Sequence, residues 1–411
     1  MTLANAHKLL KSNNVLAFNN MVAVRKEDDE AILLKEARTK IRQELRRNVQ
    51  PFDQYSQDTR SLLMEKREYH AREMAKSLPA LKMKFLTQGS YAYKTLIRIS
   101  QIGQEIDLDD GVYFGVPFVN GEPLFASKGM FSIVKQALGA LIAREGWKWS
   151  NEEKSTCLRI HLPKIAAHID LPLFAVENSE FDGVTSKYRN VFKDDIPPLI
   201  SEDALFKRAH NQFGFDESKI LLAHRTRDWI PSDPKKIHDW FEDAVSIYGN
   251  ILRRICRYLK AWRDNIWVEC ELSSLSLMAM AVEALNRIGE RPSEKRDDAV
   301  LLGVVSEIPK LIRTGQVGIP QLNLKFDTKW SMSERSLFAG EFEELSGKLR
   351  RALNNTRVNT IVVDYFTDAL GSRIPNRPDW VDVAIASQID PIVKTLPSKV
   401  AAPYVGSSSS G

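Results

Sequence analysis

Two aspartates one residue apart are the first feature of the sequence that could do chemistry. They lie in the segment Ile106-Asp107-Leu108-Asp109. On a β-strand, successive side chains point to opposite faces, so both aspartates share one face while the two apolar residues point into a core. Two carboxylates this close repel each other unless a cation lies between them. Carboxylate oxygens suit Mg²⁺, which usually keeps phosphate oxygens and waters as its other ligands.

A third aspartate occurs in a similar setting. The segment His168-Ile169-Asp170-Leu171 places Asp170 on one face of a predicted strand, with its apolar neighbours on the other. Three carboxylates on adjacent strands can hold two divalent ions. Such a pair activates an attacking oxygen and stabilises a leaving one. The pattern therefore predicts phosphoryl or nucleotidyl transfer.

A glycine-serine pair, Gly89-Ser90, precedes the aspartates. Glycine lets the backbone approach a ligand closely. The Ser90 hydroxyl and nearby backbone N–H groups can bind phosphate oxygens, especially where a helix begins. Tyr91 or Tyr93 could stack on a base. The segment is thus a candidate for binding a nucleotide.

These signals have alternative interpretations. An Asp-x-Asp pair is expected roughly once in a chain of this length. The aspartates of 107–110, followed by Gly111, are also typical of a turn at the end of a strand. His168 shares a face with the third aspartate, where it either supports a metal ligand or is simply packed. Arg38, Arg42 and Arg46 share one helix face, which indicates either a solvated surface or a basic stripe beside an anionic ligand.

The elements that must position these residues follow from the hydrophobic pattern. Alternation of apolar residues predicts strands in KMKFLTQGS, IDLDDGVYFGV, TCLRIHLP and AAHIDLPLFAV, all within 82–175. Helical spacing predicts helices within 27–78, 128–145, 239–262, 273–285, 296–313 and 335–370, with Asp233-Pro234 a helix start. The polar stretch 176–235 predicts loops.

This order predicts an α+β fold, with a small mixed sheet and helices followed by a helical bundle. We expect N-terminal helices and a catalytic core over 1–235, a helical domain over 236–390 and a flexible tail over 391–411. The active site is expected in the cleft between the two domains.

Composition excludes several classes of protein. The 411 residues contain 58 Lys+Arg against 53 Asp+Glu, and a net charge of +5 is too mild to indicate a dedicated DNA-binding protein. Three cysteines without a Cys-x-x-Cys pair exclude a disulfide scaffold and leave a zinc site without an obvious ligand set. No apolar run approaches the length of a membrane span or a signal peptide, so we expect a cytoplasmic protein without membrane contact.

The order of strand, Gly-Ser, helix and aspartate strands resembles the polymerase-β-like nucleotidyltransferases. The segments FLTQGSYAYKTL, GQEIDLDDGVYFGVP, TCLRIHL, HIDLPLFAV, DWIPSDPKKIHDWF, RRICRYLKAWRD and SSLSLMA resemble, in this order from about 85 to 285, the bacterial cGAS/DncV-like nucleotidyltransferases. Among these, the DncV-type cyclic GMP-AMP synthases are the most similar. The resemblance implies a polymerase-β-like core with a C-terminal helical domain.

The resemblance also implies site roles. Asp107 and Asp109 would bind two Mg²⁺ ions, with Mn²⁺ as a possible substitute, and Asp170 would complete one site and help deprotonate the attacking hydroxyl. Nucleotide contacts are implied for the residues that match the family's segments, which are Gln88, Gly89, Ser90, Tyr93, Arg159, Ser232, Asp233, Lys260 and Ser274.

Within that set, the implied contacts differ. Gly89 and Ser90 would hold the donor triphosphate, and Tyr93 would stack on the donor base. Lys260 and Ser274 would reach the triphosphate from the far wall of the cleft. The remaining members, at 159 and 232–233, would face the acceptor nucleotide.

The function implied by the resemblance is synthesis of a cyclic dinucleotide, 3′,3′-cyclic GMP-AMP, from ATP and GTP in anti-phage (CBASS) signalling, where the product activates a separate effector. A terminal nucleotidyltransferase acting on RNA and a catalytically silent nucleotide-binding protein are the alternatives. Cys157 and His161 are too isolated to form the zinc module of the metazoan DNA sensor, so no DNA activator is implied. Gly411 ends the tail as either an engineered scar or a site for a ubiquitin-transfer-like conjugating partner.

Overall fold

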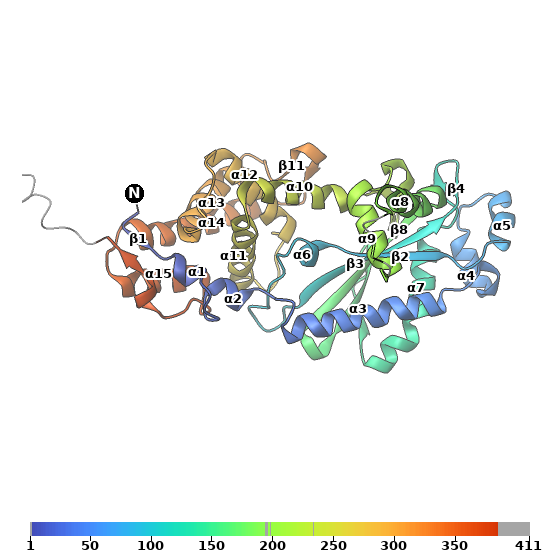
Figure 1. Ribbon diagram of the computed structural model, residues 1–411, viewed down its shortest axis with the longest axis horizontal. Helices are drawn as coiled ribbons and strands as arrows, with labels where there is room; N and C mark the ends of the chain where they lie inside the picture. The colour runs from blue at the N-terminus through green and yellow to red at the C-terminus, as the bar shows by residue number, and fades with distance from the viewer. Residues whose placement is uncertain (1, 194–195, 198, 233, 385–411) are drawn as a thin grey trace, which may run out of the picture.

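A computed structural model describes residues 2–193, 196–197, 199–232 and 234–384 of the chain. The described residues form an elongated molecule with a sheet and its helices at one end and a helical domain at the other (Figure 1). The expected α+β architecture is therefore confirmed.

A mixed seven-stranded sheet forms the centre of the first domain. Its strands run in the order β10-β9-β8-β3-β2, with β7 beside β8 and β6 beside β7. Only β3 and β8 pair in parallel, and the other neighbours are antiparallel. The bounds are Lys82–Thr87 (β2), Ile106–Val116 (β3), Lys148–Trp149 (β6), Cys157–Leu162 (β7), Ala167–Glu177 (β8), Ile220–His224 (β9) and Asp228–Pro231 (β10).

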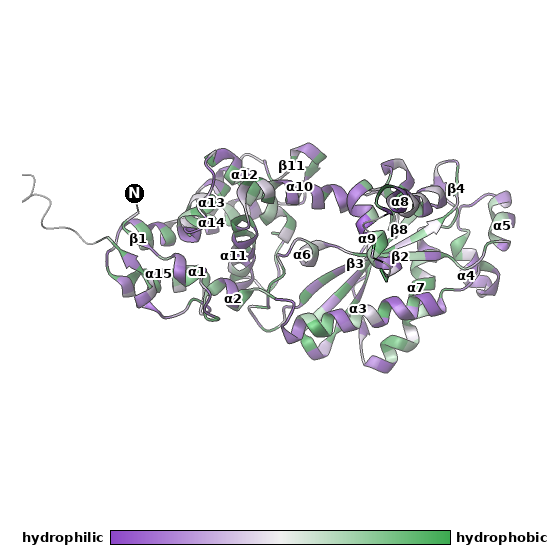
Figure 2. Cartoon of the chain, viewed as in Figure 1, coloured by the Kyte–Doolittle hydropathy of each residue, from purple (hydrophilic) through white to green (hydrophobic). Residues whose placement is uncertain are grey.

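Helices cover both faces of this sheet. The long helices α3 (Asp29–Asn48) and α7 (Ser127–Glu145) pack side by side on one face with α4 (Gln57–Leu63), and α5 (Tyr69–Lys76) lies beyond them. Helix α3 is largely hydrophilic in Figure 2, and its core contacts come from one apolar stripe that includes Leu34, Ile41 and Leu45.

The prediction of loops over 176–235 is wrong. The segment contains α8 (Asn178–Val191), α9 (Glu202–Phe213) and the antiparallel pair β9–β10. Helices α8 and α9 pack against the other face of the sheet around Phe181 and Phe206, which are buried against Phe174 and Tyr113 of the strands. Apolar residues in this segment are sparse but fall on one helix face, so burial against the sheet decides its structure.

The second domain is a helical bundle, as predicted. Its helices are α10 (Pro234–Tyr248), α11 (Ile251–Ile266), α12 (Ser274–Ile288), α13 (Asp297–Arg313), α14 (Met332–Asn354) and α15 (Asn359–Leu370). The predicted helix 335–370 is two helices, and α11 is the most buried of the set, with Trp262 and Tyr258 in the core. Short strand pairs complete the described residues, β4 (Phe118–Val119) with β5 (Glu122–Pro123) and β11 (Gly318–Ile319) with β12 (Leu324–Lys325).

The N-terminal segment packs against the helical domain. Strand β1 (Ala4–Asn5) pairs with β13 (Asp382–Val383), and α1 (His7–Leu10) and α2 (Phe18–Val22) lie in the hydrophobic cluster of the bundle. The domain boundary expected at 235 therefore does not describe the start of the chain. The sheet domain begins near α3, after the chain has crossed from the helical domain.

The tail expected over 391–411, with Gly411, lies outside the described residues. Among the helices that the structure describes, none is long and apolar enough to cross a membrane.

Candidate active site

The three predicted aspartates meet near the beginnings of two neighbouring strands, β3 and β8. Strand β3 carries Asp107 and Asp109 on one face, and the parallel register of β3 and β8 places Asp109 directly opposite Asp170. Oxygen atoms of Asp107 and Asp170 lie within 4.8 Å of each other and of a nitrogen of His168. The turn interpretation is wrong, because β3 continues through Gly111 to Val116. We call these three aspartates the carboxylate trio.

Burial and mutual repulsion both act on the carboxylates of the trio. Burial raises the pKa of Asp109, and the neighbouring carboxylates of Asp107 and Asp170 raise it further. Burial also acts to raise the pKa of Asp107, but contact with His168 and the positive charges of Arg159 and Lys260 bring that pKa below its ordinary value. The protein thus keeps one carboxylate ionised and disfavours ionisation of its neighbour. A divalent cation would relieve this conflict, so the residues present fit such an ion.

Arg159 lies inside this site. It is the cross-strand partner of Asp170 in the antiparallel pair β7–β8, and its Nε and Nη2 atoms each donate to that carboxylate at 2.7 Å. Because the guanidinium of Arg159 is paired with Asp170, it does not point its donors at a nucleotide in this structure. The acceptor contact implied for Arg159 stays a prediction, and its observed role is to orient and neutralise Asp170.

His168 contacts the trio from β8. Its Nε2 atom lies 3.0 Å from Oδ1 of Asp107, and its Nδ1 atom lies 3.0 Å from Oε2 of Glu105. The Nε2 atom is buried, and the contact is an ion pair without regular hydrogen-bond geometry. Of the two alternatives left open for His168, support of a candidate metal ligand agrees with this geometry.

Gly89 begins the short helix α6 (Gly89–Ala92), close to the trio. Its φ of +59° favours glycine, and a Cβ atom there would lie 1.8 Å from Oδ2 of Asp109. Only a residue without a side chain leaves that carboxylate in place. The close approach of a ligand to Gly89 stays a prediction, and its packing against Asp109 was not predicted from the sequence.

Ser90 meets the helical domain through Lys260 of α11. The Lys260 ammonium donates to the Ser90 hydroxyl at 2.9 Å and to the Thr95 carbonyl at 3.0 Å. Lys260 is only 4% exposed. Burial, with repulsion from Arg263, lowers its pKa to about 8, although Asp264 and Asp107 pull it upward. A buried ammonium with a depressed pKa is prepared to gain charge when an anion binds.

A cleft between the two domains joins these groups. It is lined by Ser90 and Asp107 from the sheet domain and by Lys260, Arg263 and Ser274 from the helical domain. The Ser274 hydroxyl accepts a hydrogen bond from Arg263 at 3.4 Å. The structure therefore brings together, on opposite walls, the residues predicted to reach a triphosphate.

Gln88 and Tyr93 line a neighbouring cavity with basic side chains. The amide of Gln88 donates to the hydroxyl of Tyr113 at 2.6 Å. The ring of Tyr93 is only 8% exposed and packs 5.6 Å from that of Phe241. Most of the Tyr93 ring is therefore already covered by protein side chains. The base-stacking role of Tyr93 and the nucleotide contact of Gln88 stay predictions. The other side chains that line this cavity include Lys94, Lys207, Lys235 and His238.

The predicted acceptor residues of the loop after β10 are described only in part. Ser232 is half-buried there, and Asp233 lies outside the described residues. The structure does not bring Ser232 among the residues that line the cleft.

Sequence reasoning missed several partners of the site. In the basic stripe of α3, Arg42 pairs with the fully buried Asp110, and Arg38 donates to the Thr87 hydroxyl at 2.7 Å. Arg46 at the end of the stripe is exposed and pairs with Asp203. Glu105 was missed because it precedes the strand, and no spacing rule connects it to His168. The only available signal was the Glu-x-Asp-x-Asp alternation around Ile106.

Two family models match the chain. Residues 83–174 match "Cyclic GMP-AMP synthase DncV-like, nucleotidyltransferase domain", and residues 249–382 match "Cyclic GMP-AMP synthase, C-terminal domain". Together they cover more than half of the chain, and they occur in the order that the two domains show in Figure 1. The chain belongs to the DncV-like nucleotidyltransferases. The family suggested by the sequence segments is thereby confirmed.

Curated relatives show the same likeness. A cyclic GMP-AMP synthase of Escherichia coli (strain TW11681) is 34% identical over 235 residues, which are 56% of this chain and 52% of that protein. A cyclic GMP-AMP synthase of Vibrio cholerae is 37% identical over 217 residues, which are 51% of this chain and 49% of that protein. The chain spans about half the length of the curated relatives it matches.

Solved structures match over more of the chain. Vibrio cholerae DncV in complex with the linear intermediate 5′ pppA(3′,5′)pG superposes with a TM-score of 0.73 at 25% identity, covering 94% of this chain and 100% of that one. A mutant of the same enzyme in complex with ATP, GTP and 5MTHFGLU2 gives 0.75 at 26%, with the same coverage. The arrangement of the two domains is thus that of a known nucleotidyltransferase fold.

Proposed function

We propose that this chain is a cyclic dinucleotide synthase that makes 3′,3′-cyclic GMP-AMP from ATP and GTP at the carboxylate trio. The observation that carries the proposal is the register of β3 and β8, which sets Asp109 opposite Asp170 with Asp107 on the same face. The names of the curated relatives and the ligands of the solved structures support ATP and GTP as the substrates.

The trio would hold divalent cations, which we propose to be two Mg²⁺ ions with Mn²⁺ as a substitute. When bound, these ions neutralise the phosphates and activate the attacking and leaving oxygens. The chain itself positions the reactants. Ser90 and Lys260 lie where a triphosphate between the cleft walls would meet a hydroxyl and an ammonium. Asp170, oriented by Arg159, lies at the edge of the trio where it can accept the proton of the attacking hydroxyl.

The reaction comprises two similar transfers. In the first, the 3′-oxygen of one nucleotide forms a bond to the α-phosphorus of the other, and the bond to pyrophosphate breaks. The linear product then turns over in the cleft, and its remaining 3′-hydroxyl attacks its own α-phosphorus with loss of a second pyrophosphate. Positioning and electrostatic stabilisation supply most of the rate in such transfers, so the charged walls of the cleft suit the task.

The cellular role follows as part of the same proposal. We place the enzyme in the cytoplasm, in anti-phage signalling, with its product activating a separate effector. A ubiquitin-transfer-like partner would join Gly411, in the part of the tail outside the described residues, to other molecules. Neither a membrane nor a DNA activator is part of the proposal.

The experiment is incubation of the protein with all four nucleoside triphosphates and Mg²⁺, or Mn²⁺ in parallel, followed by phosphatase and mass spectrometry. The expected result is a phosphatase-resistant cyclic dinucleotide of one AMP and one GMP unit. The Asp107→Ala/Asp109→Ala variant should give none. Asp182→Ala is the matched control, because its carboxylate is exposed and pairs with Lys82 away from the cleft.

Other products would contradict the proposal in distinct ways. Extension of an added RNA without a cyclic product would indicate a terminal nucleotidyltransferase. Nucleotide binding without turnover, with either metal, would indicate a silent nucleotide-binding protein. Equal product from the double variant would reject the trio as the active site.

A further inference from the structure

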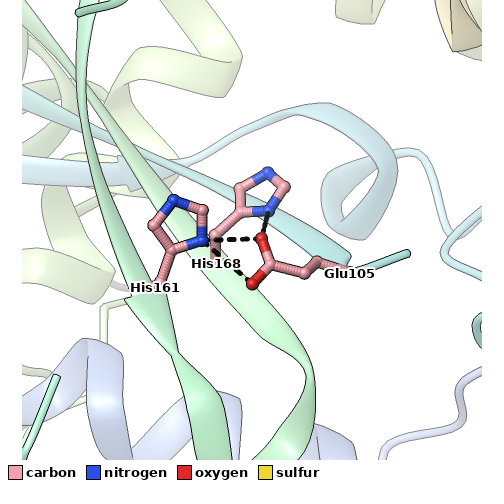
Figure 3. A group of neighbouring side chains, drawn as sticks. All are labelled: Glu105, His161 and His168. Atoms are coloured by element: carbon pink, nitrogen blue, oxygen red, sulfur yellow. Dashed lines mark hydrogen bonds and ion pairs between the residues drawn. The ribbon is translucent and has the colours of Figure 1, made fainter. Parts of the chain in front are cut away.

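A second cluster of metal-ligating side chains lies beside the trio. It consists of Glu105, immediately before β3, His161 of β7 and His168 of β8. The two histidines are cross-strand partners in the antiparallel pair β7–β8, so both rings lie on the same face of the sheet. Figure 3 shows the Glu105 carboxylate facing both rings. Glu105 thus meets two histidines that lie 56 and 63 residues away in the sequence.

The ligand atoms of the cluster are close to one another. Nδ1 of His161 lies 2.9 and 2.7 Å from the two oxygens of Glu105, and Nδ1 of His168 lies 3.0 Å from Oε2 of Glu105. Ligand atoms around a tetrahedral zinc ion are about 3.3 Å apart, given bond lengths of about 2.0–2.1 Å. A small rotation of the Glu105 side chain, which is 26% exposed, opens that space.

The donor atoms differ in kind from those of the trio. Two imidazole nitrogens and one carboxylate are a ligand set for zinc and similar transition metals, whereas a set of oxygens alone suits Mg²⁺. His161 is 29% exposed on its side chain, so an ion can reach the cluster from solvent. Three protein ligands would leave a fourth position for water.

The contact between His168 and Asp107 completes the pattern of a metal site. A histidine that binds metal through one ring nitrogen usually donates the N–H of the other to a carboxylate, which fixes the tautomer and the ring orientation. In His168 the Nδ1 atom faces Glu105, and the buried Nε2 atom lies 3.0 Å from Asp107. A carboxylate therefore lies at the distance that this pattern requires, and a turn of the ring would bring the Nε2–H into line with it.

We propose that Glu105, His161 and His168 form a binding site for a transition-metal ion of the Zn²⁺ class, separate from the Mg²⁺-type trio. An ion there would hold the proton of His168 on Nε2, directed at Asp107, and would so connect this site to the trio. The proposal differs from the expectation that Cys157 and His161 are too isolated to form a zinc module of the metazoan kind, because it uses another ligand set around His161. It does not rest on the proposed synthase activity, because it is tested by binding alone.

The test is Zn²⁺ binding to the full chain, measured by competition with a chromogenic chelator in the presence of a large excess of Mg²⁺. His161→Ala and Glu105→Gln should each raise the Kd for Zn²⁺ by more than about 10–100-fold. That range is the loss of metal affinity when a residue that supports a metal-binding side chain is removed, and a metal-binding side chain itself should matter more. Glu105→Gln preserves the shape of the side chain and guards against misfolding of the alanine variant. His70→Ala is the matched control, since His70 also lies beside a glutamate, at 3.2 Å, but on exposed α5.

Asp170→Asn separates the two sites, since it removes a carboxylate of the trio and leaves the cluster intact. It should leave the Kd for Zn²⁺ within a few-fold of the parent. In crystals soaked with Zn²⁺, an anomalous peak should lie among the two Nδ1 atoms and the Glu105 carboxylate. A peak only at the trio, loss of binding in Asp170→Asn but not in His161→Ala, or no binding at all would overturn the proposal.

Discussion

Lys260 offers the sharpest test of the cleft, because its charge should depend on pH in the range where nucleotides are stable. Burial lowers its pKa from 10.5 to about 8. The free protein therefore holds a neutral amine in an increasing share of molecules as the pH rises above 8. A triphosphate favours the charged form, so binding should raise the pKa and take up a proton.

The size of the effect follows from that pKa. At pH 7 about nine tenths of the molecules carry the charge, and at pH 9 about one tenth do. If only the charged form binds well, the apparent Kd for a non-hydrolysable GTP analogue rises about tenfold between these values, which is about 1.4 kcal/mol. At pH 8 binding should take up about half a proton.

The assay is isothermal titration calorimetry from pH 6.5 to 9.5, repeated at pH 8 in buffers with different heats of ionisation. Lys260→Arg is the matched variant, because its guanidinium stays charged throughout and should flatten the pH dependence. Lys260→Met should bind weakly at every pH. The reasoning is refuted if wild-type affinity is the same at pH 7 and pH 9, or if Lys260→Arg keeps the full tenfold change.

Three further predictions concern the trio and the sheet domain. Asp107→Ala/Asp109→Ala should lower turnover by more than about 100-fold. In EDTA, Asp109→Ala alone should raise the melting temperature, more at pH 8 than at pH 5, because the raised pKa of Asp109 means that its ionisation opposes folding. Asp107 is kept in this variant because its lowered pKa means that its ionisation favours folding. A lower melting temperature of Asp109→Ala at pH 8 would contradict this. Gly89→Ala should cost roughly 1–2 kcal/mol of stability for its positive φ and displace the Asp109 carboxylate. The free energy of unfolding measured in urea and the turnover should therefore both fall. Normal turnover would be inconsistent with the close packing. Burial lowers the pKa of His210 to about 4, so the free energy of unfolding should fall by about 2 kcal/mol as the pH falls from 8 to 5. In urea unfolding, His210→Phe should show a smaller fall over the same pH range. An equal fall in the variant would exclude His210 as the source.

Local pattern was sufficient for much of the fold. Alternation in Ile106-Asp107-Leu108-Asp109 placed both carboxylates on one face, and the structure has them there. Helical spacing likewise predicted α7, α12 and α13 to within a few residues. These features depend on neighbours in the sequence, and the side-chain period of a strand or helix determines them directly.

Partners across the sheet were not predictable in this way. That Arg159 meets Asp170, or that Glu105 reaches two histidines, depends on strand order and register, which local sequence does not encode. The prediction of loops over 176–235 was wrong for a related reason. Its helices owe their stability to burial of a few residues, such as Phe206, against a sheet that lies elsewhere in the sequence.

The pairing of β1 with β13 has a consequence for how the chain acquires its structure. The two strands are separated by the whole sheet domain, and the backbone N–H of Ala6 reaches the carboxylate of Asp298. Contacts of such long sequence separation form late, since loop closure is unfavourable until the intervening chain is compact. The sheet domain, whose strands and helices lie between these ends, can fold while synthesis continues. The helical domain is complete only when residues near 383 have joined β1, so we expect the cleft wall that carries Lys260 to be completed after the wall of the sheet domain.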